Sequence, residues 1–143
     1  MNILYYHQYF ITREGSGGTR SYENARALVE AGHEVTMVCG HGRSGLKDKY
    51  KKGLRSGNVN GINVIQFDTQ YSNIQSLTRR TFSFFNFIFR SSRLVFTLDY
   101  DVIVATSTPL TIGIPGILAK IFRKKYFVFE VRDLWPELPK AMG

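Results

Sequence analysis

The sequence predicts an α/β domain built around a doubly wound parallel sheet, and two observations support this class. Five short apolar runs, which we interpret as strands, alternate with helix-like runs or a loop along the 143 residues. These runs are continuously apolar, which is typical of strands buried on both faces of a parallel sheet. The expected strands are residues 2–6, 34–39, 62–67, 101–105 and 126–131.

The segments between the strands have distinct patterns. Tyr22, Ala25, Leu28 and Val29 recur at helical spacing, and Gly32 follows them where a helix would end. Further helices are expected over residues 76–98 and 110–122. Residues 40–60 mix glycines with lysines, which predicts a mobile loop, with a short helix in part of it as the alternative.

The order of the elements predicts where a ligand binds. In a doubly wound sheet of order 3-2-1-4-5, the first and fourth strands are neighbours, and ligands lie beyond the carboxyl ends of such strands. The loops at those ends are residues 7–18 and 106–109, with residues 132–137 after the fifth strand nearby. We therefore expect EGSGGTR (14–20), TSTP (106–109) and RDLWPE (132–137) to be neighbours at one edge of the sheet.

The composition restricts the partners and the compartment. A net charge of +8 favours anionic partners such as nucleic acid, phosphorylated substrates or acidic lipid surfaces. The single cysteine, Cys39, excludes an internal disulfide framework and suits a reducing compartment. The sequence shows no cleavable signal pattern and no apolar run of about 18 residues. We expect a cytosolic protein that can still contact a membrane.

The glycine-rich stretch does not fit the common nucleotide-binding loops. Gly15, Gly17 and Gly18 lack the spacing of the dinucleotide fingerprint, and the second strand ends without a carboxylate, which disfavours an NAD-dependent enzyme. A Walker loop is excluded because no G-K-[ST] follows. Two alternatives are left: the glycines only form a turn, or their amides and the start of the helix bind an anion. Arg20 favours a phosphate or an acidic sugar.

Four segments together resemble the N-terminal half of a glycosyltransferase of the GT-B fold, family 4. They are YYHQYF (5–10), GSGGTRSYENARALVEAGHEVTMVC (15–39), DVIVATSTPLTIGIPGILAK (101–120) and VFEVRDLWPE (128–137). The resemblance covers nearly the whole chain and weakens over residues 42–58 and 70–98. The combination of GGTRSYE, AGHEV and RDLWPE resembles the subgroup that acts on amino sugars in surface-polysaccharide assembly.

This resemblance implies a reaction and a domain organisation. Family members transfer a sugar from a nucleotide diphosphate to an acceptor hydroxyl with retention of configuration, typically without a metal. The nucleotide-sugar is a substrate, so no cofactor is expected. A second α/β domain, absent from residues 1–143, supplies most nucleotide-sugar contacts in such proteins. We therefore expect a single acceptor-side domain with little or no transferase activity alone.

The resemblance also assigns residues to the site. Gly17 and Gly18 are implied to approach the donor phosphates and the acceptor, with electrostatic support from Arg20. Asp133 is the implied catalytic residue, which would orient the acceptor hydroxyl or stabilise positive charge at the anomeric carbon. The alternative for Asp133 is an ion pair with Arg132 or a turn cap.

Other polar residues near the predicted edge are weaker candidates for binding the acceptor. His7 and His41 follow the first two strands and face the predicted cleft. Thr106 and Ser107 either bond the acceptor or cap the next helix, and Arg132 lies in the neighbouring loop. No cluster of His, Cys and carboxylates has metal-ligand spacing, so we predict no metal site.

Residues 76–98 have the composition of a membrane-surface segment. They contain no acidic residue and four arginines among phenylalanines, and residues 43–55 carry six basic residues against one acidic. Arginines with exposed aromatic residues suit anionic head groups and acyl chains. A helix on a sheet also buries one apolar face, but at about 100° per residue the phenylalanines cannot all point inward. The predicted membrane contacts are Arg79, Arg80, Phe84, Phe85, Phe87, Arg90 and Arg93.

The alternative to an enzyme is a non-catalytic module that binds an acidic glycan or nucleic acid. No nucleic-acid motif is present, and the clustered phenylalanines are too hydrophobic for a surface that stacks single strands. We therefore expect a nucleotide-sugar donor, a lipid-linked or glycan acceptor and an anionic membrane surface as partners, and no nucleic acid. The expected location is cytoplasmic, peripheral at the inner face of the cell membrane.

Overall fold

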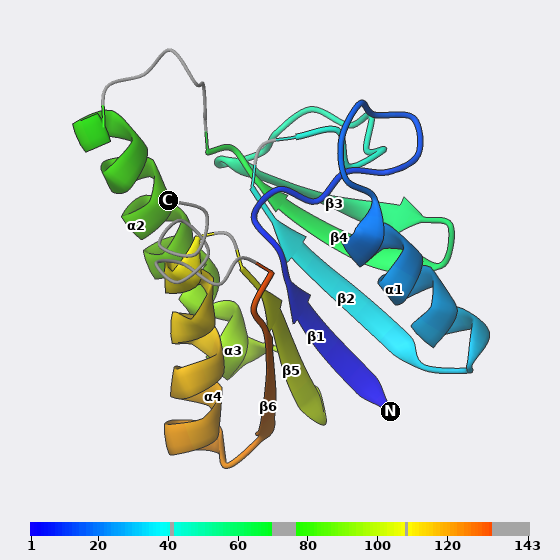
Figure 1. Cartoon of the computed structure of the whole chain (residues 1–143), viewed down its shortest axis with the longest axis vertical. Coiled ribbons are helices and arrows are strands. Elements are labelled where there is room, and N and C mark those ends of the chain that lie inside the picture. Colours follow the sequence, from blue (N-terminus) through cyan, green and yellow to red (C-terminus); the bar gives the residue numbers. More distant parts are fainter. Residues whose placement is uncertain (41, 70–76, 108, 133–143) are drawn as a thin grey trace, which may run out of the picture.

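The computed structural model describes residues 1–40, 42–69, 77–107 and 109–132, and for residues 77–80 it describes the backbone alone. Its centre is a six-stranded sheet of order β3-β4-β2-β1-β5-β6 (Figure 1). The strands are β1 (Asn2–Tyr6), β2 (Glu34–Cys39), β3 (Leu54–Val59), β4 (Ile62–Phe67), β5 (Val102–Thr106) and β6 (Tyr126–Glu130). Among the strands of the described residues, β3 and β4 pair antiparallel and the other neighbours pair parallel. The predicted α/β class is confirmed, and the five predicted strands occur in the predicted order.

Helices cover both faces of the sheet. Helix α1 lies on one face, and three helices and a 3-10 turn lie on the other (Figure 1). They are α1 (Arg20–Glu30), α2 (Leu77–Ser92), α3 (Leu94–Thr97), η1 (Leu110–Gly113) and α4 (Ile114–Arg123). The single helix predicted over residues 76–98 is therefore two helices. Within the described ranges, no helix has the length and apolarity needed to cross a membrane.

Strand β1 shows why the strand runs are continuously apolar. Ile3 and Tyr5 belong to the core beneath α1, whereas Leu4 and Tyr6 belong to the core beneath α2, α3 and α4. Successive side chains of a strand point to opposite faces, so a central strand with helices on both sides needs apolar residues at every position. The continuous apolar run of β1 therefore follows from its position at the centre of the sheet.

The predicted loop over residues 40–60 contains a strand that the sequence analysis missed. Strand β3 pairs antiparallel with β4, and Val59 lies opposite Ile62. Asn60 and Gly61 form the two-residue connection, with φ angles of 51° and 86°. An Asn-Gly pair in left-handed conformation is the preferred turn for such a hairpin. The glycine and the polar residues of LRSGNV argued against a strand, although the Asn-Gly turn after it indicated a hairpin.

Phe87 corrects the predicted set of membrane contacts. Its side chain is fully buried, and its ring meets that of Phe67 edge to face, with centroids 5.9 Å apart. An edge-to-face pair of buried rings stabilises the packing of α2 on β4. Phe87 therefore belongs to the core and is not available to a membrane.

Arg90 is also committed to the protein. Its Nη2 donates a hydrogen bond of 2.7 Å to the carbonyl oxygen of Gly53, and its guanidinium lies 5.3 Å from the ring centroid of Phe67. Arg90 thus ties α2 to the turn before β3. Among the other predicted contacts, Phe85 and Arg93 are exposed and Phe84 is half-buried. The side chains of Arg79 and Arg80 lie outside the described part.

Candidate functional site

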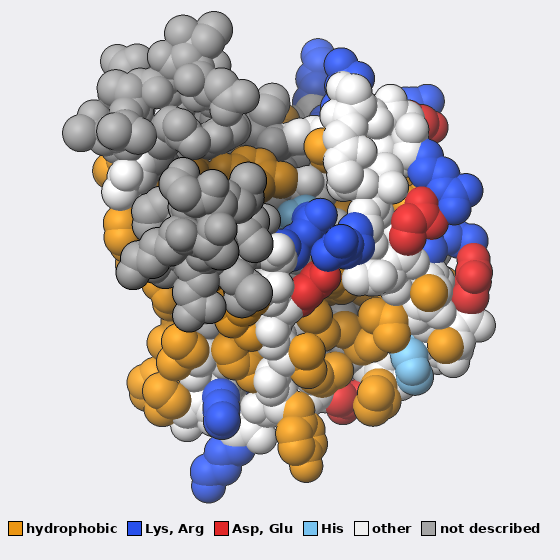
Figure 2. Space-filling view, viewed as in Figure 1, with side chains coloured by type: hydrophobic (Ala, Val, Ile, Leu, Met, Phe, Trp, Pro, Cys, Tyr) orange, Lys and Arg blue, Asp and Glu red, His pale blue; other side chains and the backbone are white. Residues whose placement is uncertain are grey.

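The described parts of the three segments expected to be neighbours, residues 14–20, 106–107 and 132, meet at the carboxyl ends of β1, β5 and β6. Tyr6 of β1 is paired with Ala105 of β5, and Thr106 of β5 with Glu130 of β6. The loop after β1 returns over this edge into α1. Figure 2 shows basic and acidic side chains meeting near the centre of this face of the molecule. The carboxyl edge of β1, β5 and β6, called the carboxyl edge below, is the candidate site.

The glycine loop adopts a shape that a side chain would disturb. Gly17 has a φ of 151°, and a Cβ atom there would come within 2.8 Å of the Cδ1 atom of Ile11. Gly18 lies beside Arg132, because a Cβ atom at Gly18 would be 3.6 Å from a guanidinium nitrogen. The bare backbone of Gly18 therefore faces Arg132.

Helix α1 begins directly behind this loop. Thr19 precedes the helix and makes no side-chain hydrogen bond to it, and the first backbone bond runs from the Glu23 amide to the Thr19 carbonyl. The amides of a first helical turn have no partner within the helix and point outward along its positive end. Arg20, the first residue of α1, is exposed beside them. This arrangement favours an anion.

Glu130 connects the elements of the site, and the sequence analysis did not single it out. Its Oε1 atom lies 3.5 Å from Nη1 of Arg20, and its Oε2 accepts a 2.7 Å hydrogen bond from Thr106. The Thr106 hydroxyl is in turn 3.1 Å from the hydroxyl of Tyr5. One carboxylate therefore joins α1, β5 and β6. The available signal was an acidic residue ending an apolar strand next to the predicted switch point.

Ser107 fixes the loop after β6. Its amide donates to the Glu130 carbonyl at 2.9 Å, and its hydroxyl accepts from the Arg132 amide at 2.9 Å. Thr106 and Ser107 are both buried. Their hydroxyls thus serve internal hydrogen bonds, which corrects the expectation that they contact an acceptor. Neither residue caps a helix, because Pro109 holds the position before η1.

His7 lies beneath the site. Its ring is 3% exposed, and Nδ1 is 2.6 Å from the hydroxyl of Ser21 in α1. Burial and, to a smaller extent, the positive charge of Arg132 lower the pKa of His7 to about 4, and the negative charge of Glu130 partly opposes this shift. The imidazole is therefore neutral at neutral pH and supports the start of α1. This corrects the expectation that His7 faces the acceptor.

Two predicted site residues, Asp133 and His41, lie outside the described residues, so their assignments stay predictions. The structure brings together Gly18, Arg20 and Arg132 around Glu130. Among these described residues, two guanidinium groups lie near one carboxylate. Among the described residues, no group of three or more His, Cys, Asp or Glu side chains is placed to hold a metal.

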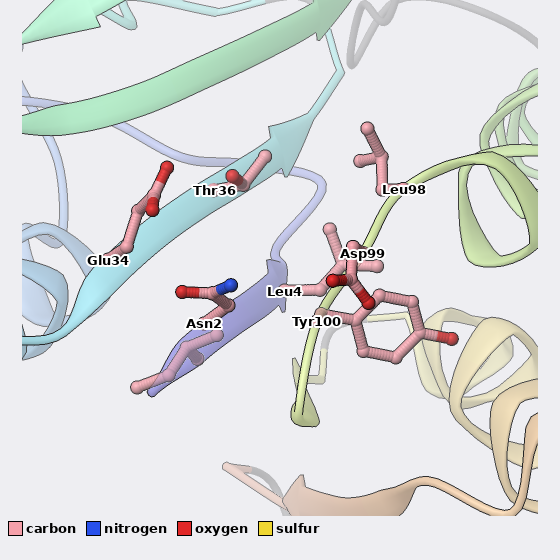
Figure 3. A pocket seen from close by; sticks show the side chains of 8 residues that line it. Asn2, Leu4, Glu34, Thr36, Leu98, Asp99 and Tyr100 are labelled. Atoms are coloured by element: carbon pink, nitrogen blue, oxygen red, sulfur yellow. The ribbon is translucent and has the colours of Figure 1, made fainter.

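A small cavity of ≈ 160 Å³ lies near the opposite ends of the strands (Figure 3). It is lined by residues that include Asn2, Glu34, Asp99 and Tyr100. Residues 2 and 34 begin β1 and β2, so this cavity lies at the amino ends. Ligands of open α/β sheets bind at the carboxyl ends. The cavity is therefore not the candidate site.

Comparison with known protein families identifies the chain. A model of the glycosyl transferase 4-like domain matches residues 15–143, which include the glycine loop, α1, β5 and β6. The chain belongs to this family. The resemblance to family 4 that the sequence predicts is thus confirmed at the level of the family.

A solved structure shows the same fold. It is described as trehalose-6-phosphate from E. coli bound with UDP-2-fluoro glucose, and it matches with a TM-score of 0.53 and 13% sequence identity. The match covers 90% of this chain and 32% of that one, so the chain spans about a third of its length. At this identity the likeness supports the GT-B fold alone. No curated protein matches the chain in sequence.

Within a glycosyl transferase 4-like domain, the geometry of this edge suits an anionic group. Backbone of the glycine loop, the first turn of α1 and two arginines face the same space. Glu130 lies 3.5 Å from the guanidinium of Arg20, and Ser107 fixes the backbone of Arg132. Donors that are fixed in advance stabilise charge without reorganisation.

Proposed function

We propose that this chain is the acceptor-side domain of a retaining glycosyltransferase that uses a nucleotide-sugar donor. The observation that carries the proposal is the Arg20, Glu130 and Arg132 cluster beside the glycine loop. When the bond between the anomeric carbon and the diphosphate breaks, the departing diphosphate gains negative charge. Backbone amides and guanidinium groups placed in advance stabilise that charge.

The roles follow from the contacts. Arg20 and the first turn of α1 face the diphosphate, and the backbone at Gly17 and Gly18 allows close approach. Glu130 orients Arg20 and does not itself touch the donor. Asp133 is proposed to orient the acceptor hydroxyl, on the strength of the family resemblance alone. No cofactor or metal takes part in this proposal.

The acceptor is proposed to be linked to a lipid or a polysaccharide, and the transferred sugar to be a hexose or an N-acetylhexosamine. The sequence stretches GGTRSYE and RDLWPE, with their likeness to surface-polysaccharide enzymes, support this choice. We propose peripheral association with the cytoplasmic face of an anionic membrane, where such an acceptor is anchored. The donor would be held mainly by a second domain, so we expect residues 1–143 alone to transfer no sugar.

The test is a sugar-transfer assay on the encoded protein over its full length, with Arg20→Ala and Arg132→Ala variants. Removing one preorganised donor is expected to lower kcat about a hundredfold. Arg26→Ala is the matched control, because Arg26 lies on α1 and pairs with Glu30 away from the site. Equal activity of the Arg20 and Arg26 variants would refute the assignment. Release of nucleotide diphosphate from a panel of nucleotide-sugars identifies the donor.

A further inference from the structure

Large apolar side chains are exposed over α2, α3 and α4, a surface called the α2–α4 face below. Single exposed apolar residues are ordinary, but a contiguous patch marks a place where something binds. On α4, burial on the sheet accounts for Pro115, Gly116 and Ala119. The apolar residues left open on the three helices include Phe82, Phe85, Phe89, Phe96, Ile121 and Phe122.

A groove runs through this face. Its volume is ≈ 410 Å³, and its lining is almost entirely apolar, with Phe85 and Phe89 from α2 and Leu118 from α4. The rings of Phe96 and Phe122 lie 6.2 Å apart and extend the apolar surface from α3 to α4. Helices α2, α3 and α4 thus form one continuous apolar surface. The composition of residues 76–98 did not indicate that α4 contributes to it.

The exposed charged side chains described on this face are cations, namely Arg93, Lys120 and Lys124. Two acidic residues, Asp99 and Asp101, occur between Leu77 and Lys125. Asp101 accepts a hydrogen bond from the Asn2 amide at the start of β1, away from the groove. Exposed cations flank the apolar patch: Arg93 lies 5.8 Å from the ring centroid of Phe89, and Lys120 lies on α4.

We propose that the α2–α4 face docks on an anionic phospholipid bilayer, with α4 and α2 both inserting apolar side chains and the groove receiving part of an acyl chain. Exposed aromatic and aliphatic side chains rimmed by cations suit the boundary between head groups and acyl chains. A second copy of the chain is a poorer partner for this face, because in a symmetric dimer the cations of the two copies would repel each other.

This inference deepens the proposed function, because it states which face lies against the membrane that carries the acceptor. Vesicle binding involves no donor sugar, so its failure and the failure of sugar transfer are separate results.

The experiment is sedimentation of the chain with vesicles of phosphatidylcholine, with and without phosphatidylglycerol. We expect binding to the anionic vesicles. The paired variant Phe89→Ser with Phe122→Ser is expected to weaken it about tenfold for each phenylalanine. Tyr126→Ser is the matched control, since Tyr126 is an aromatic residue on β6 that is even more exposed than Phe89 and Phe122. Unchanged binding by the paired variant, or an equal loss with Tyr126→Ser, would overturn the proposal.

Charge and insertion are tested separately. The paired variant Lys120→Gln with Lys124→Gln is expected to bind anionic vesicles about fivefold more weakly for each cation removed. The paired variant Lys47→Gln with Lys49→Gln is expected to bind them as tightly as the unchanged chain. Cys39 is buried, so a cysteine introduced at position 89 or 122 is the thiol that an environment-sensitive dye labels. The dye should shift to the blue on anionic vesicles at both positions but not at 126. Self-association in sedimentation equilibrium that the paired phenylalanine variant abolishes would instead identify a second copy and refute the bilayer.

Discussion

At the carboxyl edge, polar side chains are held by partners inside the protein, whereas on the α2–α4 face large apolar side chains lie open. Thr106 and Ser107 are buried and bonded to the strand and loop of Glu130 and Arg132. Phe89 and Phe122 are 70% and 67% exposed, which is unusual for residues of this size beside a filled core. The same sheet therefore supports two kinds of surface.

The difference teaches what each surface can recognise. Hydrogen bonds inside a protein are directional and strengthened by low dielectric, so the carboxyl edge has a fixed shape for a ligand of defined geometry. Apolar contact and screened charge have little directionality, so the α2–α4 face suits a fluid partner such as a bilayer. Catalysis needs the first kind of surface, and attachment to a membrane needs the second.

The largest expected effect separates two phenylalanines of α2. Phe87→Ala should lower the free energy of unfolding by about 3–5 kcal/mol, because it empties a fully buried site. Phe89→Ala should change it by less than about 0.5 kcal/mol, because that ring is exposed. Urea denaturation followed by circular dichroism measures both. A loss of similar size at both positions would show that the α2–α4 face is part of a core, and the contrast drawn above would be wrong.

His7 gives the next largest effect, through pH. Its pKa is lowered to about 4 in the folded state from its ordinary 6.5, so the unfolded chain binds the proton more tightly. Stability is therefore complete above about pH 6.5 and falls as the pH drops towards 4, by about 2 kcal/mol between pH 7 and pH 5. Urea midpoints across this range measure the loss. His7→Asn, which can still bond Ser21, should remove this part of the dependence, and an unchanged pH profile would contradict the buried neutral imidazole.

The strand order could be predicted because its physical cause is local. Because β1 is buried on both faces, it needs an apolar residue at nearly every position, and this run is visible in the sequence. The alternation of strands and helices then restricts the possible topologies. The network around Glu130 could not be predicted in the same way. Its partners Arg20 and Thr106 meet it only through the pairing of β5 with β6 and the placement of α1. Such contacts depend on side-chain rotamers, which the spacing of residues in the sequence does not predict.

The limits were different on α2 and β3. Phenylalanines at 82, 84, 85, 87 and 89 occupy every side of a helix, so the pattern does not reveal which ring faces the core. Strand β3 was missed because LRSGNV has a single β-branched residue, Val59, among polar residues and a glycine, although Asn60 and Gly61 marked the hairpin turn. In both cases the local sequence gives the alternative structures nearly equal free energies, and tertiary packing determines which one forms.

The smallest expected effect compares two arginines three residues apart. Arg90 bonds the Gly53 carbonyl and lies over Phe67, so Arg90→Ala should lower the free energy of unfolding by about 1 kcal/mol and leave vesicle binding unchanged. Arg93 is exposed beside Phe89, so Arg93→Ala should leave stability within about 0.5 kcal/mol and weaken binding to anionic vesicles about fivefold. Thermal unfolding and vesicle sedimentation on the same two variants measure the pair. The reverse pattern would mean that the cation holding β3 also meets the membrane, and that the structural and membrane-binding roles of α2 are not divided between its two sides.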